Sequence, residues 1–392
     1  MRRTLAKAPL FLAAFGSLFW LVLGAGWFRG VRKVPVLRDA AEPVPTEYPS
    51  LSVVVPARDE ERAVGESVRS MVAQEYPGTL EVVAVDDRSA DRTGEILESM
   101  LVEHPSLLRV LHVTQLPEGW LGKNYALSLG AAEARGDWLL FTDADVVFAP
   151  GCFRKAVSYA VGNGLHHLAL APELFSRGAL LGGFVAAFEL MFVMTQRPWR
   201  AKDPRAREHV GIGAFNLVRR EAYLEAGTHR AIRMRPDDDM KLAKLLKDRG
   251  FRQDVASGVG LVGVEWHRPV RGTVRGLTKS MFPSMDYRLG PVALATPVLL
   301  LTNGNTFVGV FVARGAARAL SVTSVALIAL VYAYGERRKG LGTSLLYAAL
   351  HPFSVSAFVY AVLRSAYTIL ANGGIEWRGT WYPLERLEEN VV

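Results

Sequence analysis

Cysteine is almost absent from this chain: Cys152 is the one thiol among 392 residues. A single cysteine excludes an internal disulfide and a metal site built from several cysteines. We interpret Cys152 as a small buried apolar residue. Internal repeats, low-complexity tracts and nucleic-acid-binding motifs are also absent from the sequence. The chemistry of the chain must therefore be sought in its other residue types.

Acidic residues are outnumbered by basic ones, which gives a net charge of +8 and a pI near 9.6. A basic surface attracts anionic lipid headgroups or nucleic acid. Half of the residues are apolar, so the chain has room for one catalytic domain and several membrane segments. Because such segments would tether the chain, we expect a membrane partner and no nucleic acid.

Four apolar stretches are candidates for crossing a bilayer: residues 9–28, 291–313, 320–334 and 345–370. The third stretch is short. The fourth contains His351-Pro352 and Arg364, which predicts a kinked or re-entrant helix. The first could instead be a cleaved signal peptide, but Leu-Gly-Ala-Gly-Trp is a poor cleavage site, which favours a retained anchor. Basic residues at 337–339 favour a cytoplasmic catalytic domain on an integral membrane protein of the bacterial plasma membrane type.

Short apolar runs alternate with helical periodicity from residue 51 onward. The runs 51–55, 81–85, 109–113 and 138–141 are predicted strands. Helices are predicted around 64–72, 93–102 and 124–134, between these runs. Alternation of this kind is typical of an α/β domain, in which helices cover both faces of a parallel sheet.

Three acidic clusters follow in order: Asp86-Asp87, Asp143-Ala144-Asp145 and Asp237-Asp238-Asp239. The first two come directly after predicted strands, where the carboxyl ends of an α/β sheet bind ligands. Hard oxygen ligands hold Mg²⁺ or Mn²⁺ against phosphates. Because spacing of two sends both carboxylates of an extended segment to one side, Asp143 and Asp145 are the predicted metal ligands. The alternative is a turn with solvated aspartates.

Other residues at the predicted strand ends are candidates for binding a nucleotide diphosphate. Asp86 and Asp87 could accept hydrogen bonds from a uracil N–H or a ribose hydroxyl, and Ser89 or Asp91 beside them could also cap a helix. Lys123 precedes a predicted helix, where a cation and free N–H groups both attract phosphate. The remaining candidates end the first strand: Pro56, Ala57, Arg58 and Glu60.

The third cluster begins a predicted helix whose buried face includes Leu242 and Leu246. Asp239 is the best candidate for a general base, with Asp238 in support. The helix dipole favours ionised Asp239, whereas the neighbouring aspartates oppose ionisation and raise its pKa. Helix capping is the alternative role of the cluster.

The apolar segment 178–195 contains Glu189 and lies between the second and third clusters, so a span there would separate the parts of one site. We interpret it as a core or interfacial helix. Residues 268–290 mix arginines with apolar residues, as an amphipathic surface helix does. These features divide the chain into an anchor (1–33), a linker (34–50), a catalytic domain (51–267), an interfacial segment (268–290), membrane helices (291–370) and a tail (371–392).

Taken together, the ordered motifs resemble a family 2 glycosyltransferase with the GT-A fold, over about residues 50 to 255. The matching segments are 53–60, 85–93, 122–126, 142–145 and 238–242. The resemblance implies a nucleotide-sugar donor and inversion at the anomeric carbon, with a metal on the leaving group and a base that deprotonates the acceptor. It also implies a cationic partner for the diphosphate, for which Arg275 is a candidate.

Trp120-Leu-Gly-Lys123, the segment 183–195 and the ending 376–382 are similar to the carotenoid- and hopanoid-associated branch of the family. That branch implies transfer of one sugar, most simply glucose from UDP-glucose, to a polyisoprenoid-derived lipid. A processive synthase would carry Gln-x-x-Arg-Trp after the base, and this chain lacks that order. A polyprenyl-phosphate glycosyltransferase, a polymer synthase and an inactive nucleotide-binding scaffold remain as alternatives.

Overall fold

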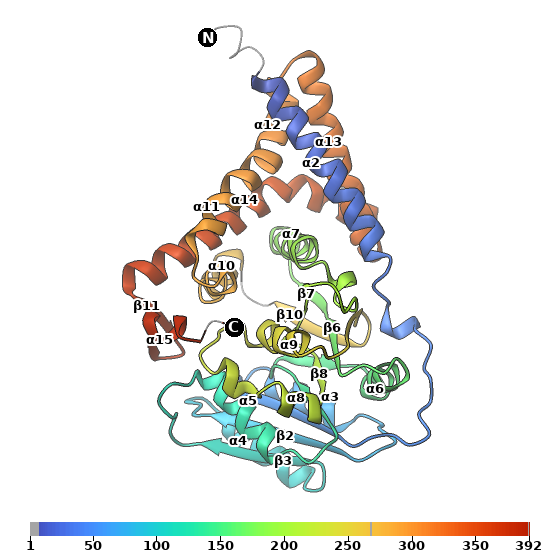
Figure 1. The fold of residues 1–392 in the computed structure, drawn as a ribbon, viewed down its shortest axis with the longest axis vertical. Helices are drawn as coiled ribbons and strands as arrows, with labels where there is room; N and C mark the ends of the chain where they lie inside the picture. The colour runs from blue at the N-terminus through green and yellow to red at the C-terminus, as the bar shows by residue number, and fades with distance from the viewer. Residues whose placement is uncertain (1–7, 267–268, 391) are drawn as a thin grey trace. The chain divides into compact units, whose positions relative to one another are not determined.

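The computed structural model describes residues 8–266, 269–390 and 392 of the chain (Figure 1). These residues form two compact units. The first unit comprises the described residues of Met1–Lys33, Ser176–Arg197 and Trp266–Leu384, and the second comprises those of Val34–Phe175, Pro198–Glu265 and Glu385–Val392. The segment 176–197 therefore packs with the first unit, although it lies inside the predicted catalytic domain. The basic residues that precede the first apolar stretch lie outside the described residues.

A mixed sheet in the second unit has the strand order β3-β2-β1-β4-β8-β6-β9. All four predicted strands are present, and the sheet also contains three strands that were not predicted. The strands are β1 (Leu51–Ala57), β2 (Leu80–Asp87), β3 (Leu108–Val113), β4 (Trp138–Phe141), β6 (His167–Ala171), β8 (Asn216–Arg219) and β9 (Gln253–Ser257). The expectation of an all-parallel sheet was wrong in one respect, because β8 runs antiparallel to both of its neighbours, β4 and β6.

Helices cover both faces of this sheet, as predicted for an α/β domain. Alternate residues of β1 point to opposite sides. Val53 and Val55 belong to a core with α3 and α6, whereas Val54 belongs to a core with α5, α8 and α9. Cys152 is buried in the first of these cores. The helices are α3 (Val64–Val72), α4 (Thr93–Glu103), α5 (Gly122–Glu133), α6 (Cys152–Gly162), α8 (Arg220–Glu225) and α9 (Asp238–Asp248).

A smaller sheet has the order β5-β10-β7. Its strands are β5 (Val146–Phe148), β7 (Glu173–Ser176) and β10 (Val262–Trp266). Because β5 begins at Val146, Asp143 and Asp145 occupy the short connection between β4 and this second sheet. The second acidic cluster is thus held at both of its ends by strands.

The first unit consists mainly of long apolar helices, and five of its helical segments are long and apolar enough to cross a membrane. One of the five is formed by α11, the π-helix η5 and α12 in succession. The helices are α2 (Ala8–Val31), α7 (Ala179–Gln196), α10 (Val270–Leu277), α11 (Leu289–Leu299), η5 (Leu300–Gly304), α12 (Asn305–Val312), α13 (Gly315–Gly335) and α14 (Leu341–Asn372). A hairpin of β11 (Gly374–Trp377) and β12 (Thr380–Pro383) follows, and α15 (Leu384–Glu388) comes after it.

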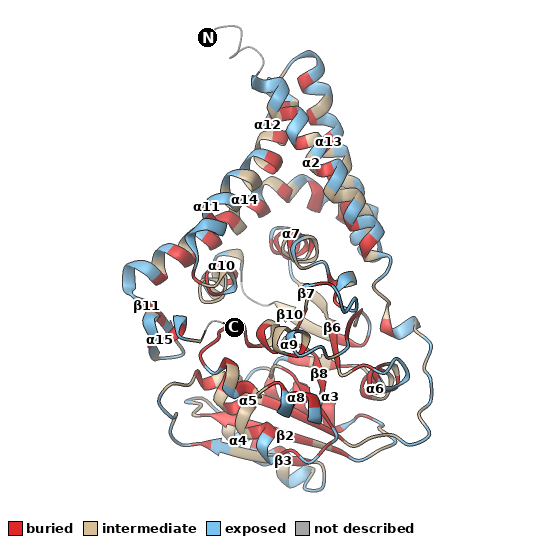
Figure 2. Cartoon of the chain, in the orientation of Figure 1, coloured by how far each residue is buried: buried red, intermediate tan, exposed pale blue. Residues whose placement is uncertain are grey.

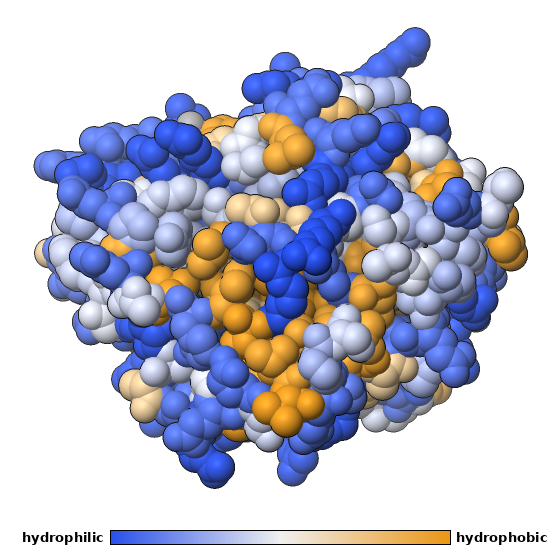
Figure 3. All heavy atoms as spheres, turned by 90° about the horizontal axis from the view of Figure 1, so that it is seen from below, coloured by the Kyte–Doolittle hydropathy of each residue, from blue (hydrophilic) through white to orange (hydrophobic). Residues whose placement is uncertain are grey.

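All four predicted membrane stretches are helical, although their limits differ from the prediction. The third, α13, extends to 21 residues, and α14 continues through Pro352. The segment α7 also meets the length and composition of a span, so its interfacial placement stays a prediction. Most exposed large apolar side chains lie on helices of the first unit (Figure 2), whereas the face in Figure 3 is mainly hydrophilic around a central apolar area.

A buried polar cluster explains why the fourth stretch tolerates a histidine. His351 Nε2 donates to Asn303 Oδ1 at 2.7 Å, and its Nδ1 accepts from the Tyr332 hydroxyl at 2.9 Å. Asn303 lies in η5, whose geometry leaves the carbonyl oxygen of Thr302 to accept from Trp20 Nε1 at 3.1 Å. Each buried polar group thus has a partner, as an apolar surrounding requires.

Candidate active site

The carboxyl ends of β1, β2 and β4 carry the predicted nucleotide and metal residues at one edge of the sheet. Because β8 is antiparallel to β4 and Asn216 pairs with Phe141, the loop that precedes β8 reaches the same edge. The antiparallel strand therefore adds residues 209–215 to the site. Sequence reasoning did not include them.

Gly213 in this loop joins the second acidic cluster to the third. Its carbonyl oxygen accepts from the Asp143 N–H at 3.1 Å, and its own N–H donates to Asp239 Oδ2 at 2.7 Å. A Cβ atom on Gly213 would lie only 2.7 Å from Asp143 Oδ2. A Cβ atom on nearby Gly211 would overlap the backbone of Asp239. The two glycines allow this close approach, and their Gly-x-Gly spacing was the one available signal.

Lys123 connects the same two clusters through its side chain. Its Nζ lies 2.8 Å from Asp143 Oδ1 and 3.3 Å from Asp238 Oδ1. Burial alone would lower the pKa of Lys123, but the carboxylates of Asp143, Asp238 and Asp239 outweigh burial and hold that pKa above its ordinary value. The ammonium is therefore charged. Its position in the first turn of α5 agrees with the prediction, while its predicted contact with phosphate stays a prediction.

Asn124, the residue after Lys123, ties α5 to the segment that leads into the third cluster. Its buried Nδ2 lies 2.8 Å from the carbonyl oxygen of Ile232 and 2.9 Å from that of Arg235. The Leu121 N–H also donates to the carbonyl of Arg233 at 2.9 Å. The motif Gly122-Lys123-Asn124 thus fixes the distance between α5 and the start of α9.

The three aspartates of the third cluster have different partners. Asp237 is bound in a bidentate ion pair by the fully buried Arg235, at 2.8 and 3.0 Å. Asp238 is paired with Lys123. Asp239 instead accepts from two backbone N–H groups, that of Gly213 and that of Met240 at 2.8 Å.

Ionisation of Asp239 is opposed by its surroundings. Burial, followed by the charge of Asp238, raises the pKa of Asp239 to about 7, although Lys123 and the Met240 N–H act in the opposite direction. Burial also raises the pKa of Asp238. A carboxyl with a pKa near 7 is suited to exchanging protons at neutral pH. The predicted position at the start of a helix is confirmed, since α9 begins at Asp238.

The first acidic cluster, at the end of β2, is also bound by neighbouring side chains. Asp87 is buried and accepts from Arg88 Nε at 2.7 Å, with Arg58 Nη1 at 3.5 Å. Asp86 accepts from the Ser89 N–H at 3.1 Å and lies 3.0 Å from His112 Nδ1. Arg88 and His112 were not predicted. Arg88 directly follows Asp87 in the sequence, whereas His112 lies in β3 and reaches Asp86 because the two residues pair in the β2–β3 register.

The end of β1 lies beside this cluster, because Ala57 pairs with Asp86 in the β1–β2 register. Pro56 and Arg58 are half-buried, and the Glu60 N–H donates to Thr93 Oγ1 at 2.8 Å. The structure thus brings all of the predicted strand-end residues of the second unit to one edge of the sheet. Their contacts with a nucleotide stay predictions.

Asp143 and Asp145, the predicted metal ligands, offer carboxylate oxygens of the kind that a divalent cation binds. No group of three or more His, Cys, Asp or Glu side chains suited to a metal occurs among the described residues. Mg²⁺ commonly takes only one or two carboxylates and completes its shell with substrate phosphates and water. Desolvation by the surrounding chain, followed by the negative charges of Asp143 and Glu60, raises the pKa of Asp145 to about 6. A cation would relieve this repulsion, so the residues fit the metal.

Arg275, the remaining candidate, belongs to the first unit, whereas the residues described above belong to the second. It lies on α10 in the first unit, as does Arg271, and both line a cavity with Arg364 of α14. Its predicted pairing with a diphosphate stays a prediction.

Comparisons with known proteins agree with the geometry. Residues 52–226 match the family described as Glycosyl transferase family 2. The matched residues contain most of the ordered motifs that resemble this family. The chain is a glycosyltransferase.

One relative and one solved structure are similar to most of the chain. The 4,4′-diaponeurosporenoate glycosyltransferase of Staphylococcus aureus is 23% identical over 350 residues, which cover 86% of this chain and 90% of that protein. This relative confirms the resemblance to the carotenoid-associated branch. The solved mannosyltransferase of Pyrobaculum calidifontis superposes with a TM-score of 0.54 and 20% identity, covering 91% of this chain and 98% of that one. This likeness confirms the GT-A fold.

Replacement of Gly213 by alanine should lower sugar transfer by about 100-fold, because the new methyl group pushes Asp143 away from Asp239 and misplaced catalytic groups cost rate steeply. Transfer by the purified chain is the measurement. Gly65→Ala in α3 is the matched control, since its Cβ would meet Ile96 at an ordinary 3.5 Å. Equal activity of the G213A and G65A variants would contradict the bridging role of Gly213.

Proposed function

We propose that this glycosyltransferase moves a single sugar from a nucleotide diphosphate donor to an apolar isoprenoid-derived lipid, with inversion at the anomeric carbon. The observation that carries the proposal is the Gly213 bridge. It holds Asp239, a carboxylate with a pKa near 7, at a fixed position beside the proposed metal ligand Asp143.

Asp239 acts as the general base in this proposal. Ionised Asp239 accepts the proton of the acceptor hydroxyl, the oxygen attacks the anomeric carbon, and the bond to the nucleotide diphosphate breaks in line. The two backbone N–H groups on Asp239 orient its carboxylate. Asp238 and Asp237, which are paired with Lys123 and Arg235, support it without reaching the acceptor.

Asp143 and Asp145 would hold Mg²⁺ or Mn²⁺, which supplies positive charge to the departing diphosphate. Lys123, which contacts Asp143 and Asp238, supplies the side-chain cation that we propose to face the phosphates of the donor. The P. calidifontis neighbour was solved with GDP-mannose and Mn²⁺, which supports a donor of this chemical class. UDP-glucose is the donor that we propose to test first, with Asp86 and Asp87 on its nucleoside.

The acceptor is proposed to be a membrane lipid with a hydroxyl or carboxyl group. Five helical segments suited to a bilayer support membrane residence. The S. aureus relative, named for 4,4′-diaponeurosporenoate, supports an isoprenoid acceptor. We place the catalytic unit on the cytoplasmic side, where nucleotide sugars are made.

Membranes that carry the Asp239→Asn variant should transfer at least about 100-fold less label from UDP-glucose to extractable lipid than wild-type membranes, since a general base contributes that much or more. The assay follows labelled sugar in the presence of Mg²⁺ and host lipids. Asp248→Asn, at the other end of α9 and exposed, is the matched control and should keep full activity.

The fate of the label separates the alternatives. Label in a lipid that resists mild acid supports transfer to a neutral lipid, and mass spectrometry identifies it. Acid-labile lipid would indicate a polyprenyl phosphate, and label in insoluble material would indicate a polymer synthase. Equal rates of sugar transfer by the D239N variant and the wild type would refute Asp239 as the base. Absence of transfer from every nucleotide sugar would favour an inactive scaffold.

Removal of divalent cations by EDTA should abolish transfer, and Mn²⁺ or Mg²⁺ should restore it. The Asp143→Asn and Asp145→Asn variants should each lose about 100-fold, equivalent to roughly 3 kcal/mol of leaving-group stabilisation. Electron paramagnetic resonance measures the concentration of free Mn²⁺ in the presence of UDP. Addition of wild-type protein should lower this concentration, and addition of the variant with both substitutions should not. Full transfer in EDTA would refute the metal.

The pH dependence of kcat/KM should reveal the chemistry of the acceptor. Because burial and Asp238 raise the pKa of Asp239 to about 7, the ionised base is lost as pH falls. For a hydroxyl acceptor, kcat/KM should decrease about tenfold per pH unit below pH 7 and level off above it. A carboxylic acceptor, ionised above about pH 4.3, needs no base. A flat profile from pH 5.5 to 8 would therefore exclude a hydroxyl acceptor.

A further inference from the structure

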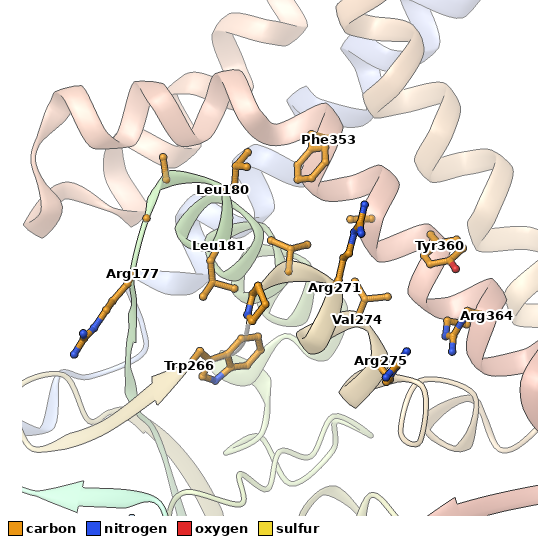
Figure 4. A pocket seen from close by; sticks show the side chains of 15 residues that line it. Arg177, Leu180, Leu181, Trp266, Arg271, Val274, Arg275, Phe353, Tyr360 and Arg364 are labelled. Atoms are coloured by element: carbon orange, nitrogen blue, oxygen red, sulfur yellow. The ribbon is translucent and has the colours of Figure 1, made fainter. Parts of the chain in front are cut away.

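A cavity of about 1220 Å³ lies within the first unit, between α7, α10 and α14 (Figure 4). Much of its wall is apolar and aromatic, with Leu181, Trp266 and Phe353 among the lining side chains. Four arginines line the same cavity: Arg177, Arg271, Arg275 and Arg364. Among the described residues that line the cavity, none is an aspartate or a glutamate. The cavity thus joins an apolar wall to a strongly positive rim.

The packing of α10 fixes two of these arginines. Val270 and Val274 share one face of the helix and pack in a cluster with Phe184 of α7 and Ala361 of α14. Arg271 and Arg275, each one residue further along, are therefore held together on the adjacent face, four residues apart. Both side chains are exposed. The apolar packing of Val270 and Val274 fixes the orientation of α10 and therefore the positions from which the two arginine side chains extend.

Like charges held four residues apart on a helix repel each other. Within the part of the chain that the structure describes, the guanidinium groups of Arg271, Arg275 and Arg364 make no ion pair or hydrogen bond. An anion with several oxygen acceptors would satisfy these guanidinium groups, which match phosphate in shape and charge.

Arg364 places this positive charge relative to a bilayer. It lies in α14, a candidate span, eight residues before the helix ends at Asn372. At 1.5 Å per residue this is about 12 Å from the helix end, and in a span that ends at Asn372 an arginine at this position would reach the headgroup level. The charge at this depth therefore belongs beside headgroups, and the apolar wall beside acyl chains.

We propose that this cavity binds an anionic phospholipid, with its phosphate among Arg271, Arg275 and Arg364 and an acyl chain along the wall formed by α7 and α14. Charge complementarity selects the anion, and the apolar lining selects an amphiphile over a soluble phosphate. The site lies wholly in the first unit and does not require sugar transfer. It gives Arg275 a role different from the predicted contact with a nucleotide diphosphate.

Fluorescence of Trp266, quenched by brominated acyl chains, reads occupancy directly. The full chain and its Trp266→Phe variant are placed in phosphatidylcholine nanodiscs that contain a minor share of brominated phosphatidylglycerol or brominated phosphatidylcholine. The difference between the two proteins isolates Trp266. We expect the phosphatidylglycerol preference to be on the order of tenfold in wild type and about one in the R271Q/R275Q/R364Q variant.

A matched control separates this cavity from general surface charge. Arg314→Gln, Arg318→Gln and Arg338→Gln remove three exposed arginines of the same unit that do not line the cavity, and this triple variant should keep the preference. Equal quenching by both lipids in wild type, or an equal loss in both triple variants, would overturn the proposal.

Two competitors test the chemistry of the occupant. Inorganic phosphate and UDP should leave the quenching unchanged. Relief of quenching by either would overturn the proposal in favour of a soluble-anion site, with Arg275 as a diphosphate ligand. Displacement of phosphatidylglycerol by oleate at an equal share would overturn the assignment of phosphate in favour of a carboxylic lipid. Because binding is read without turnover, failure of the proposed transferase reaction would leave this test unaffected.

Discussion

Repulsion among carboxylates is the constraint on which the architecture of the second unit depends. Asp143, Asp145, Asp238 and Asp239 lie at one edge of the sheet, and the burial of Asp238 strengthens its charge interactions. Without further support, carboxylates this close together would move apart, or one of them would take up a proton. Here the Lys123 ammonium lies between two of the carboxylates, and the Gly213 backbone holds a third from the opposite side. The separation is thus set by rigid groups.

The supporting structure follows from the same constraint. Lys123 can bridge the clusters only if α5 stays at a fixed distance from α9, and the buried Asn124 carboxamide supplies that fixed distance through backbone carbonyls. Removing one partner of a buried ion pair leaves an uncompensated charge. Arg235 and Asp237 are buried together, and the charge of Arg235 neutralises Asp237, one aspartate of the third cluster. The neutralised aspartate adds little repulsion to Asp239.

Much of this organisation could be predicted from local sequence. Strand alternation, the positions of the first two clusters at strand ends and the helix that begins at the third are all local patterns. The antiparallel direction of β8 was not predictable, because a four-residue strand has no local signal for its partner. Gly213 and His112 were missed for the same reason, since each acts through a partner that only the register of the sheet brings close. The limits of α13 and the π-helix η5 depend on packing between helices, which composition alone does not encode.

The raised pKa of Asp239 connects stability to catalysis. The folded state favours the protonated carboxyl, so folding stability is lost as pH rises from the ordinary carboxyl pKa to about 7, and this loss is the cost of holding the ionised base. A base with an ordinary carboxylate pKa would be ionised without this cost, but it would be a weaker proton acceptor. The charge of Lys123 and the Met240 N–H moderate the shift by stabilising the ionised form, while the hydrogen bonds to the Asp239 carboxylate itself come from the backbone N–H groups of Gly213 and Met240. The use of backbone donors at Asp239, and of lysine and arginine at its two neighbours, therefore distinguishes the proposed base from the two aspartates that hold it in place.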